Sequence, residues 1–353
     1  MKDINLNGKS VGKDEPCLIM VDAGVNHNND PKLAFELIRT AARAGADVIK
    51  FQTYTADSIT TKKAPRYWDS ALDTDSGGTQ YDTFNRLDNL PAETYYDMVE
   101  LCNKEKILFS STPFDLDSAK FLEDIGIDFF KISSSDLTYH RLIQHVADTG
   151  KPVILSTGTA SLSEISEAVE IILSSGNDKI LLQHCILSYP CNDEDANLAK
   201  MLKIMEKFPD IPVGYSDHTK GIYVPLAAVA LGARSIEKHY TLNKSLPDSP
   251  DHSLSLDPLE LEEMVKGIRT VENSIGCFTD GHYPCEEKAF KYARKSIVSI
   301  KDIPYGTIID ESMISCKRPG TGIYPKYFNE ICGKIAKEDI EKDTTITWDM
   351  IEK

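Results

Sequence analysis

The chain has 353 residues, of which 41% are hydrophobic, enough for a core larger than one ordinary domain needs. The formal net charge of −16 argues against nucleic acid or an anionic membrane as the main partner. An anionic small molecule stays compatible with this charge, because a local cluster such as Lys50, Lys131, Lys238 and Arg318 can oppose the overall sign. No apolar stretch approaches the ~20 residues of a membrane span, and the N-terminus lacks a signal-peptide apolar region. We therefore expect a cytoplasmic protein.

Eight cysteines are present, without a CxxC pair or a regular spacing. In a cytosolic chain of this size we expect them to be reduced. Cys185 follows a predicted strand and is a candidate for lining a site, although a small buried packing residue is the favoured interpretation.

In chain order, the sequence begins with a polar lead-in, residues 1–16, in which a short hairpin is predicted. Between residue 17 and about residue 270, short apolar runs alternate with segments whose apolar residues recur at helical spacing. The predicted helices include residues 31–45, 91–106, 116–126 and 161–176. This alternation predicts parallel strands joined by crossover helices.

The eight apolar runs share one feature, which is that each ends in polar residues suited to phosphate, metal or carbonyl chemistry. A (β/α)8 TIM barrel builds its active site at the C-terminal ends of its eight strands, and it is the fold we predict. A doubly wound open sheet would need a switch point and usually a glycine-rich first turn, and neither is visible. The residues are Asp22, Asn26 and His27; Lys50 and Gln52; Ser110, Ser111 and Thr112; Lys131, Ser134 and Asp136; Ser156 and Thr157; Gln183, His184 and Tyr189; Ser216, Asp217 and His218; and Glu237, Lys238 and His239.

Residues 55–85 interrupt this rhythm directly after the second strand. The segment is polar and contains Gly77 and Gly78. A long loop at this end of a barrel is usually functional, so a lid over the substrate is one interpretation. A disordered insertion is the other.

After residue 275 the pattern changes. Residues 276–294 are predicted to be a linker that separates a catalytic domain, 1–275, from a small β-rich domain, 295–353. Two similar elements support the second domain, SIVSIKDIPYGTII and GKIAKEDIEKDTTIT, because both place a Lys, an acidic residue and an Ile before a Thr-led apolar stretch.

Two histidines are candidate metal ligands. His218 and His239 end the seventh and eighth strands, which are neighbours in a closed barrel. Two imidazoles with oxygens from substrate and water suit Mn, Fe, Co or Zn. A structural hydrogen-bonding role for both histidines is about equally supported.

Hydroxyls and lysines at other strand ends form a candidate anion site. Each hydroxyl alone is better explained as a cap for the next helix. Their convergence with two lysines favours a phosphate or carboxylate ligand. The residues are Thr112, Ser134, Ser156, Ser216, Lys50 and Lys131.

Carboxylates are the candidate acid–base groups. Asp22 and Asp136 end strands on opposite sides of the barrel mouth and can divide general acid and base work if their pKa values diverge. Alternatively they only balance the lysines. Asp251, in a proline-rich turn after His239, is a candidate contact for a polyol, or part of a solvated turn.

These segments resemble the sialic acid synthase family, which includes N-acetylneuraminate, legionaminate and pseudaminate synthases. The tail resembles the family's C-terminal antifreeze-like (SAF, β-clip) domain, and the likeness extends from residue 17 to residue 353. The matching segments are GVNHN, AGADVIKFQTY, SSTPFD, FKISSSD, PVILSTGT, LLQHCILSYP, VGYSDHT, IEKHYTL, PDHSLSLDP and CKRPGTGI.

The resemblance implies a condensation of phosphoenolpyruvate with an N-acyl-mannosamine-type aldehyde, which gives a nine-carbon 3-deoxy-2-keto acid and phosphate. It implies a divalent metal, most often Mn²⁺ with Mg²⁺ or Co²⁺ as alternatives, and a domain-exchanged homodimer. The implied roles are Asp22 and Asp136 in catalysis; Lys50, Thr112, Lys131, Ser134, Ser156 and Ser216 in phosphoenolpyruvate binding; Gln52, Tyr189, Asp251 and Arg318 in sugar binding, Arg318 from the partner subunit; and His218 and His239 in metal binding.

Two positions depart from the family pattern. Asp22 stands where a glutamate is usual, and Leu187 stands where sialate-type enzymes tend to carry a polar residue. Leu187 and the 55–85 segment leave the identity of the sugar open, whereas Asp22 withdraws its carboxylate by one methylene in a tuned site. Two alternative functions are another phosphoenolpyruvate-dependent synthase that uses a phosphosugar, and a non-catalytic sugar-binding homologue.

Overall fold

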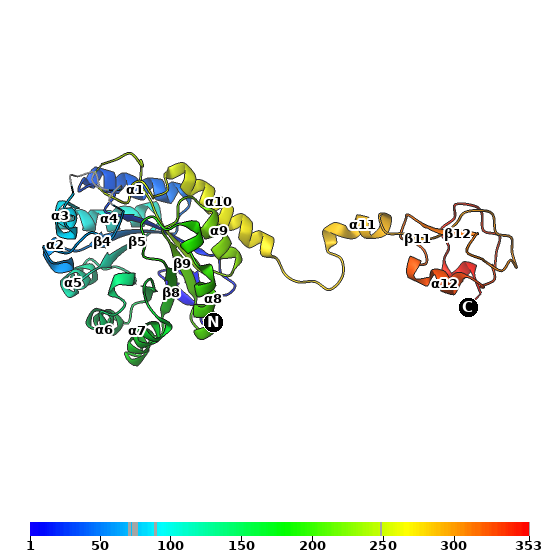
Figure 1. Cartoon of the computed structure of the whole chain (residues 1–353), viewed down its shortest axis with the longest axis horizontal. Helices are drawn as coiled ribbons and strands as arrows, with labels where there is room; N and C mark the ends of the chain where they lie inside the picture. The colour runs from blue at the N-terminus through cyan, green and yellow to red at the C-terminus, as the bar shows by residue number, and fades with distance from the viewer. Residues whose placement is uncertain (70–71, 73–76, 88–89, 248, 353) are drawn as a thin grey trace. The chain divides into compact units, whose positions relative to one another are not determined.

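The computed structural model describes residues 1–69, 72, 77–87, 90–247 and 249–352. The segment 55–85 therefore falls partly outside the described residues. The chain divides into two compact units, Met1–Gly276 and Cys277–Lys353, drawn from blue to yellow and from yellow to red in Figure 1.

The first unit contains eight parallel strands arranged as a barrel, as predicted. They are hydrogen-bonded in the order β5-β4-β3-β10-β9-β8-β7-β6, and β5 and β6 lie side by side, so the sheet nearly closes on itself. This closure rules out the open doubly wound sheet. The strands are β3 (Leu18–Gly24), β4 (Val48–Thr53), β5 (Leu108–Pro113), β6 (Phe130–Ile132), β7 (Val153–Ser156), β8 (Ile180–Cys185), β9 (Val213–Asp217) and β10 (Ser235–His239).

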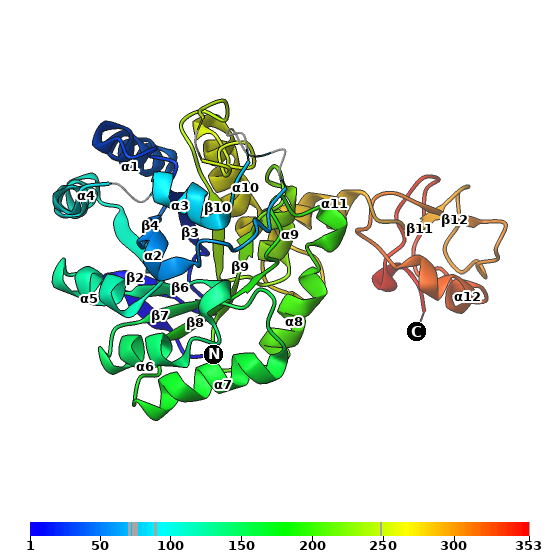
Figure 2. The same ribbon diagram turned by 60° about the vertical axis from the view of Figure 1, so that its left-hand side comes forward.

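Most of the helices of this unit form an outer ring around these strands (Figure 2). Local sequence explains several of their ends, since Asp30, Ser161 and Asp257 each cap a helix N-terminus and Gly45 ends the first long helix with a left-handed backbone. The helices are α1 (Pro31–Ala44), α2 (Ala56–Ile59), α3 (Gln80–Leu87), α4 (Ala92–Glu105), α5 (Leu116–Asp124), α6 (His140–Asp148), α7 (Leu162–Ser174), α8 (Leu198–Lys207), α9 (Tyr223–Ala230) and α10 (Pro258–Ile275). Among the described residues, no helix has the length and apolarity that a membrane crossing requires.

Alternation along the strands separates two buried layers. One set of strand residues packs against the helices, whereas the alternate set fills the barrel interior. A predicted hairpin, β1 (Ile4–Leu6) and β2 (Lys9–Val11), adds apolar side chains to the interior set. This apolar layer comprises Ile4, Leu6, Val11, Leu18, Met20, Val48, Phe129, Ile154 and Leu181. Because these residues precede the polar strand ends, the apolar layer forms the base beneath the polar interior.

The second unit is small and rich in antiparallel pairing. Strand β11 (Ser296–Ser299) pairs with β12 (Ile314–Lys317), and an isolated bridge between Ile303 and Ile340 joins the two similar elements of the sequence. The core consists mostly of isoleucines. The helices are α11 (Glu287–Tyr292), within the segment predicted as a linker, and α12 (Phe328–Ile331).

Candidate active site

A cavity of about 440 Å³ opens at the C-terminal ends of the barrel strands. Every residue of the first unit to which the family resemblance gives a role lines it. These residues are Asp22, Lys50, Gln52, Thr112, Lys131, Ser134, Asp136, Ser156, Tyr189, Ser216, His218, His239 and Asp251. Arg318 follows β12 in the second unit, where its side chain is exposed.

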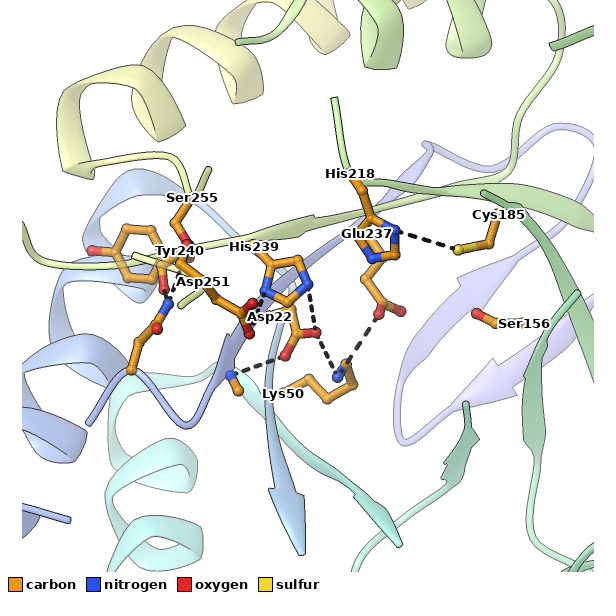
Figure 3. Close-up of polar contacts among 12 residues, drawn as sticks. Asp22, Lys50, Ser156, Cys185, His218, Glu237, His239, Tyr240, Asp251 and Ser255 are labelled. Atoms are coloured by element: carbon orange, nitrogen blue, oxygen red, sulfur yellow. Dashed lines mark hydrogen bonds and ion pairs between the residues drawn. The ribbon is translucent and has the colours of Figure 1, made fainter. Parts of the chain in front are cut away.

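Four alternating charges occupy the floor of this cavity, and Figure 3 shows three of them, Asp22, Lys50 and Glu237. Lys50 Nζ lies 2.8 Å from Asp22 Oδ2 and 3.8 Å from Glu237 Oε1, and Lys131 Nζ lies 3.3 Å from Glu237 Oε2. Burial opposes ionisation of Asp22, but the Lys50 ammonium group holds the pKa of this carboxyl below its ordinary value. Asp22 and Glu237 in turn outweigh burial and raise the pKa of Lys50. Asp22 and Lys50 therefore form an ionised pair in the floor.

The hydroxyls at the strand ends face this charged floor and do not cap helices. Lys131 Nζ donates to Ser156 Oγ at 2.8 Å, and Ser156 Oγ donates to Gln183 Oε1 at 3.4 Å. The next helices are capped by other residues, α5 by Asp115 and α7 by Ser161. For Ser156 and Thr112 the capping interpretation is therefore wrong.

Thr112 carries an unused hydrogen-bonding group. Its Oγ1 is buried and has no hydrogen-bond partner within the part of the chain that the structure describes. Ser134 Oγ, nearby on the cavity wall, accepts from the Gly158 backbone N–H at 2.9 Å and also hydrogen-bonds to the Cys185 side chain. Buried polar groups are normally satisfied, so an unpartnered hydroxyl that lines a cavity indicates a ligand-binding position.

The two histidines face each other across the cavity, with ring centroids 5.3 Å apart. His218 Nδ1 lies 2.7 Å from the Ile186 carbonyl oxygen, so Nδ1 donates there and Nε2 is the nitrogen left for a ligand. Burial opposes protonation of His218, but Cys185 outweighs it and raises the pKa of this ring to about 9, so a bound metal ion would replace the Nε2 proton. His239 lies 3.6 Å from Asp22 and 3.7 Å from Asp251. This donor set fits a divalent ion that takes its remaining ligands from substrate and water. Over the described residues, no three His, Cys, Asp or Glu side chains form a ready-made metal cluster.

Three cavity features were missed or misjudged from sequence. Glu237 lies between the two lysines, and its spacing of two from His239 on β10 was the signal that both share one face. Cys185 lines the cavity with Sγ 3.8 Å from His218 Nδ1, although packing was its favoured role. Lys238 points out of the barrel and pairs with Asp217, so its proposed membership of the anion cluster is wrong.

Aromatic residues form one wall of the cavity mouth. Tyr67 and Trp68 belong to the predicted lid segment and line the cavity. The Tyr67 ring packs edge-on against Tyr189 at 6.0 Å, and the Trp68 ring lies 6.0 Å from Phe84. These contacts favour the lid interpretation for the described part of the segment.

Comparison with known proteins agrees with this barrel and its cavity. The NeuB family model matches residues 37–280 and the SAF domain model matches residues 294–352. The chain therefore belongs to the NeuB family, and it carries the SAF domain expected from its tail.

Named relatives place the chain among condensing enzymes of the transferase class. It is 38% identical to the N,N'-diacetyllegionaminic acid synthase of Legionella pneumophila over 98% of each chain. The Campylobacter jejuni enzyme of the same name is 39% identical over 93% of this chain and 98% of that one. A crystal structure of N-acetylneuraminic acid synthetase from Leptospira borgpetersenii superimposes with a TM-score of 0.72 at 35% identity, covering 81% of this chain and 94% of that one. Other relatives are named pseudaminic acid synthase and N-acetylneuraminate-9-phosphate synthase.

Proposed function

We propose that this protein condenses phosphoenolpyruvate with an N-acyl-mannosamine-type sugar to form a nine-carbon 3-deoxy-2-keto acid and phosphate. One observation carries the proposal: two buried lysines and the unpartnered Thr112 hydroxyl face the same cavity as two opposed histidines. Lysines and a free donor suit an anion, while the histidines suit polarisation of an aldehyde. Membership of a family of named nonulosonate synthases supports the same reaction.

In this reaction C3 of phosphoenolpyruvate forms a bond to the aldehyde carbon, whose oxygen takes up a proton. Water adds to the cationic C2 and loses one proton, and the tetrahedral intermediate expels phosphate by C–O cleavage as the new C2 hydroxyl loses its proton and becomes the keto group. Lys50, Lys131, Thr112, Ser134, Ser156 and Ser216 bind the phosphoenolpyruvate anion, and Gln52, Tyr189 and Asp251 contact the sugar. His218 and His239 would hold a divalent ion, with Mn²⁺ as the first candidate, and this ion would polarise the aldehyde when bound.

Asp136 is the base we assign to the attacking water. It lies in the short 3₁₀ turn Ser134–Asp136 and lines the cavity. Burial raises its pKa to about 7, while the Ser135 hydroxyl opposes this shift. A carboxylate with this pKa is half-ionised near neutral pH, where a general base works best.

For Asp136→Asn we expect kcat to fall by about 10²–10⁴-fold, the range for loss of a general base. In the unchanged enzyme, kcat/KM should fall as the pH drops through about 7, because protonated Asp136 accepts no proton. The pKa of Asp136 lies above its ordinary value, so the native state loses stability as the pH rises from about 4 to 7. Asp136→Asn lacks this buried charge, so at pH 8 it should be at least as stable as the unchanged protein. A pH–rate profile and denaturant titration of both proteins test this. Unchanged turnover in Asp136→Asn would assign the base elsewhere.

The sugar side of the cavity favours a neutral sugar with apolar substituents. Among the described residues that line the cavity, Lys50 and Lys131 are the only lysines or arginines, and both belong to the floor. Elsewhere the lining combines polar side chains with apolar ones, and acyl or deoxy methyl groups suit contact with the apolar side chains. They are Val25, Ile59, Trp68, Phe84, Leu87, Phe114 and Leu187.

Trp68→Ala is expected to raise KM for the preferred N-acyl sugar by about tenfold or more, because an aromatic contact at the cavity wall is lost, and to change KM for phosphoenolpyruvate little. Steady-state kinetics with each substrate varied in turn measure this split. Equal effects on both substrates would contradict a role confined to the sugar. Trp348, in the second unit and half-exposed, gives the control variant Trp348→Ala.

The proposed reaction is tested by phosphate release from phosphoenolpyruvate with and without Mn²⁺. The sugars are N-acetylmannosamine, a 2,4-diacetamido-2,4,6-trideoxy-hexose, mannose and arabinose 5-phosphate. Mn²⁺-dependent release with a neutral N-acyl sugar supports the proposal. Release only with the phosphosugar favours the alternative synthase, and binding of phosphoenolpyruvate without turnover favours a non-catalytic homologue.

We also propose a domain-exchanged homodimer in which Arg318 of each subunit serves the partner's cavity. The exposed position of Arg318 in a separate compact unit is compatible with this role. An inactive Arg318→Ala protein mixed with an inactive barrel variant should regain activity through heterodimers, provided that subunits exchange.

A further inference from the structure

Glu237 is a buried carboxylate to which the proposed reaction gives no role. It lies on β10, two residues before His239, with only 4% of its surface exposed. Its side chain lines the cavity from the floor. Glutamate is almost never fully buried unless it is paired, so its partners identify its role.

The partners of Glu237 are the two lysines of the anion site. Oε1 lies 3.8 Å from Lys50 Nζ, and Oε2 lies 3.3 Å from Lys131 Nζ (Figure 3 shows the Lys50 side). Oε2 is buried and accepts no hydrogen bond from any described residue. Charge alone therefore holds this carboxylate between the lysines. Leaving a buried carboxylate oxygen without a donor is costly, which argues against a purely structural role.

The charges of the floor sum to zero before a ligand enters. Lys50 and Lys131 contribute two positive charges, and Asp22 and Glu237 contribute two negative charges. An incoming phosphate or phosphoenolpyruvate shares both lysines with Glu237. Since like charges repel strongly in a buried site, Glu237 lowers the affinity of the site for any anion.

We propose that Glu237 is a positioning residue of the anion site, which spaces Lys50 and Lys131 and offsets their charge so that the phosphate product is released. The inference rests on the proposed function, because it takes phosphate as the leaving group. An anion site with two fully available lysines would bind the product as well as the substrate. Glu237 thus limits product retention while leaving the donors in place.

Glu237→Gln tests this, because it removes the charge and nearly preserves the shape. We expect the Kd of inorganic phosphate, measured by calorimetry, to fall about tenfold. KM for phosphoenolpyruvate and the inhibition constant of phosphate should fall together, and kcat should fall because phosphate leaves more slowly. Loss of a merely structural residue would weaken anion binding instead. Unchanged or weaker phosphate binding overturns the proposal.

Glu237→Asp keeps the charge but withdraws it by one methylene, so its phosphate affinity should lie between those of the unchanged protein and Glu237→Gln. If Glu237→Gln does not fold, this variant decides the question, and phosphate binding no tighter than in the unchanged protein overturns the proposal. Glu272→Gln is the matched control. Glu272 pairs with Arg269 of α10 and accepts from the Cys17 backbone N–H just before β3 begins, outside the residues that line the cavity. Its phosphate affinity should not change.

Failure of this inference differs from failure of the proposed function. If the unchanged protein binds neither phosphoenolpyruvate nor phosphate, the proposed reaction is wrong and Glu237 has no anion to regulate. If the unchanged protein binds both and releases phosphate in the presence of a sugar, but Glu237→Gln binds phosphate no more tightly, only the role of Glu237 is wrong.

Discussion

Replacing both His218 and His239 by alanine is expected to abolish metal-stimulated turnover, a loss on the order of 10³-fold or more. The rings face each other at a centroid distance of 5.3 Å, and His218 already uses Nδ1 for the Ile186 carbonyl oxygen. Each ring therefore offers at most one nitrogen to a shared ion, and two ligands are the least that can hold it in place. Removing both leaves no imidazole among the described residues that line the cavity.

Two measurements separate this loss from unfolding. Titration of the apo protein with Mn²⁺ should show one site per chain that is absent in the double variant, while thermal unfolding without metal should change little. The control is His145→Ala, on α6, whose ring lies 3.8 Å from Glu123 and takes no part in the cavity. Full metal-dependent activity in the double variant would show that the histidines hold no ion.

Lys131→Met should lower kcat/KM for phosphoenolpyruvate by about 10²–10³-fold, the effect of losing one buried charged donor. Lys131 has 3% of its surface exposed and donates to Ser156 at 2.8 Å, so its ammonium group is oriented before substrate arrives. Methionine fills the same volume without charge. The remaining floor then carries an excess negative charge from Asp22 and Glu237, which repels the anionic substrate.

The readout is the Kd of phosphoenolpyruvate together with steady-state kinetics. We expect binding and turnover to fall together, because the lysine contacts the substrate in both states. Lys151→Met is the control. Lys151 is half-buried and donates to the Ile127 carbonyl oxygen, but it lies before β7 begins and lines no part of the cavity. Lys131→Met with unchanged phosphoenolpyruvate affinity would remove this lysine from the anion site.

The barrel and the small second domain were predictable because their signals are local. A strand shows its apolar run and a helix its 3.6-residue period within a few residues, and the alternation of the two limits the fold to few arrangements. The C-terminal ends of parallel barrel strands meet at one rim, so polar residues at those ends were expected to share a cavity, as Lys50, Lys131 and His239 do.

Side-chain direction and partnership depended on the closed barrel. Glu237 and Lys238 are neighbours in sequence, yet their side chains lie on opposite faces of β10. Lys238 pairs with Asp217 on the outer face, whereas Glu237 lies between two lysines inside the barrel. From sequence alone, the hydroxyls of Thr112 and Ser156 were interpreted as helix caps. In the folded structure, Asp115 and Ser161 cap the helices that follow these strands.

The aromatic wall also joins distant parts of the chain, since Tyr67 meets Tyr189 across more than a hundred residues. Strand ends and helical periodicity depend on residues that are close in the sequence, so both could be predicted from the sequence alone. Ion pairs, unpartnered hydroxyls and ring contacts arise between strands and loops that only closure of the barrel brings within a few ångströms of each other. For that reason the residues of the site were predictable one by one, whereas their electrostatic arrangement emerged from the folded structure.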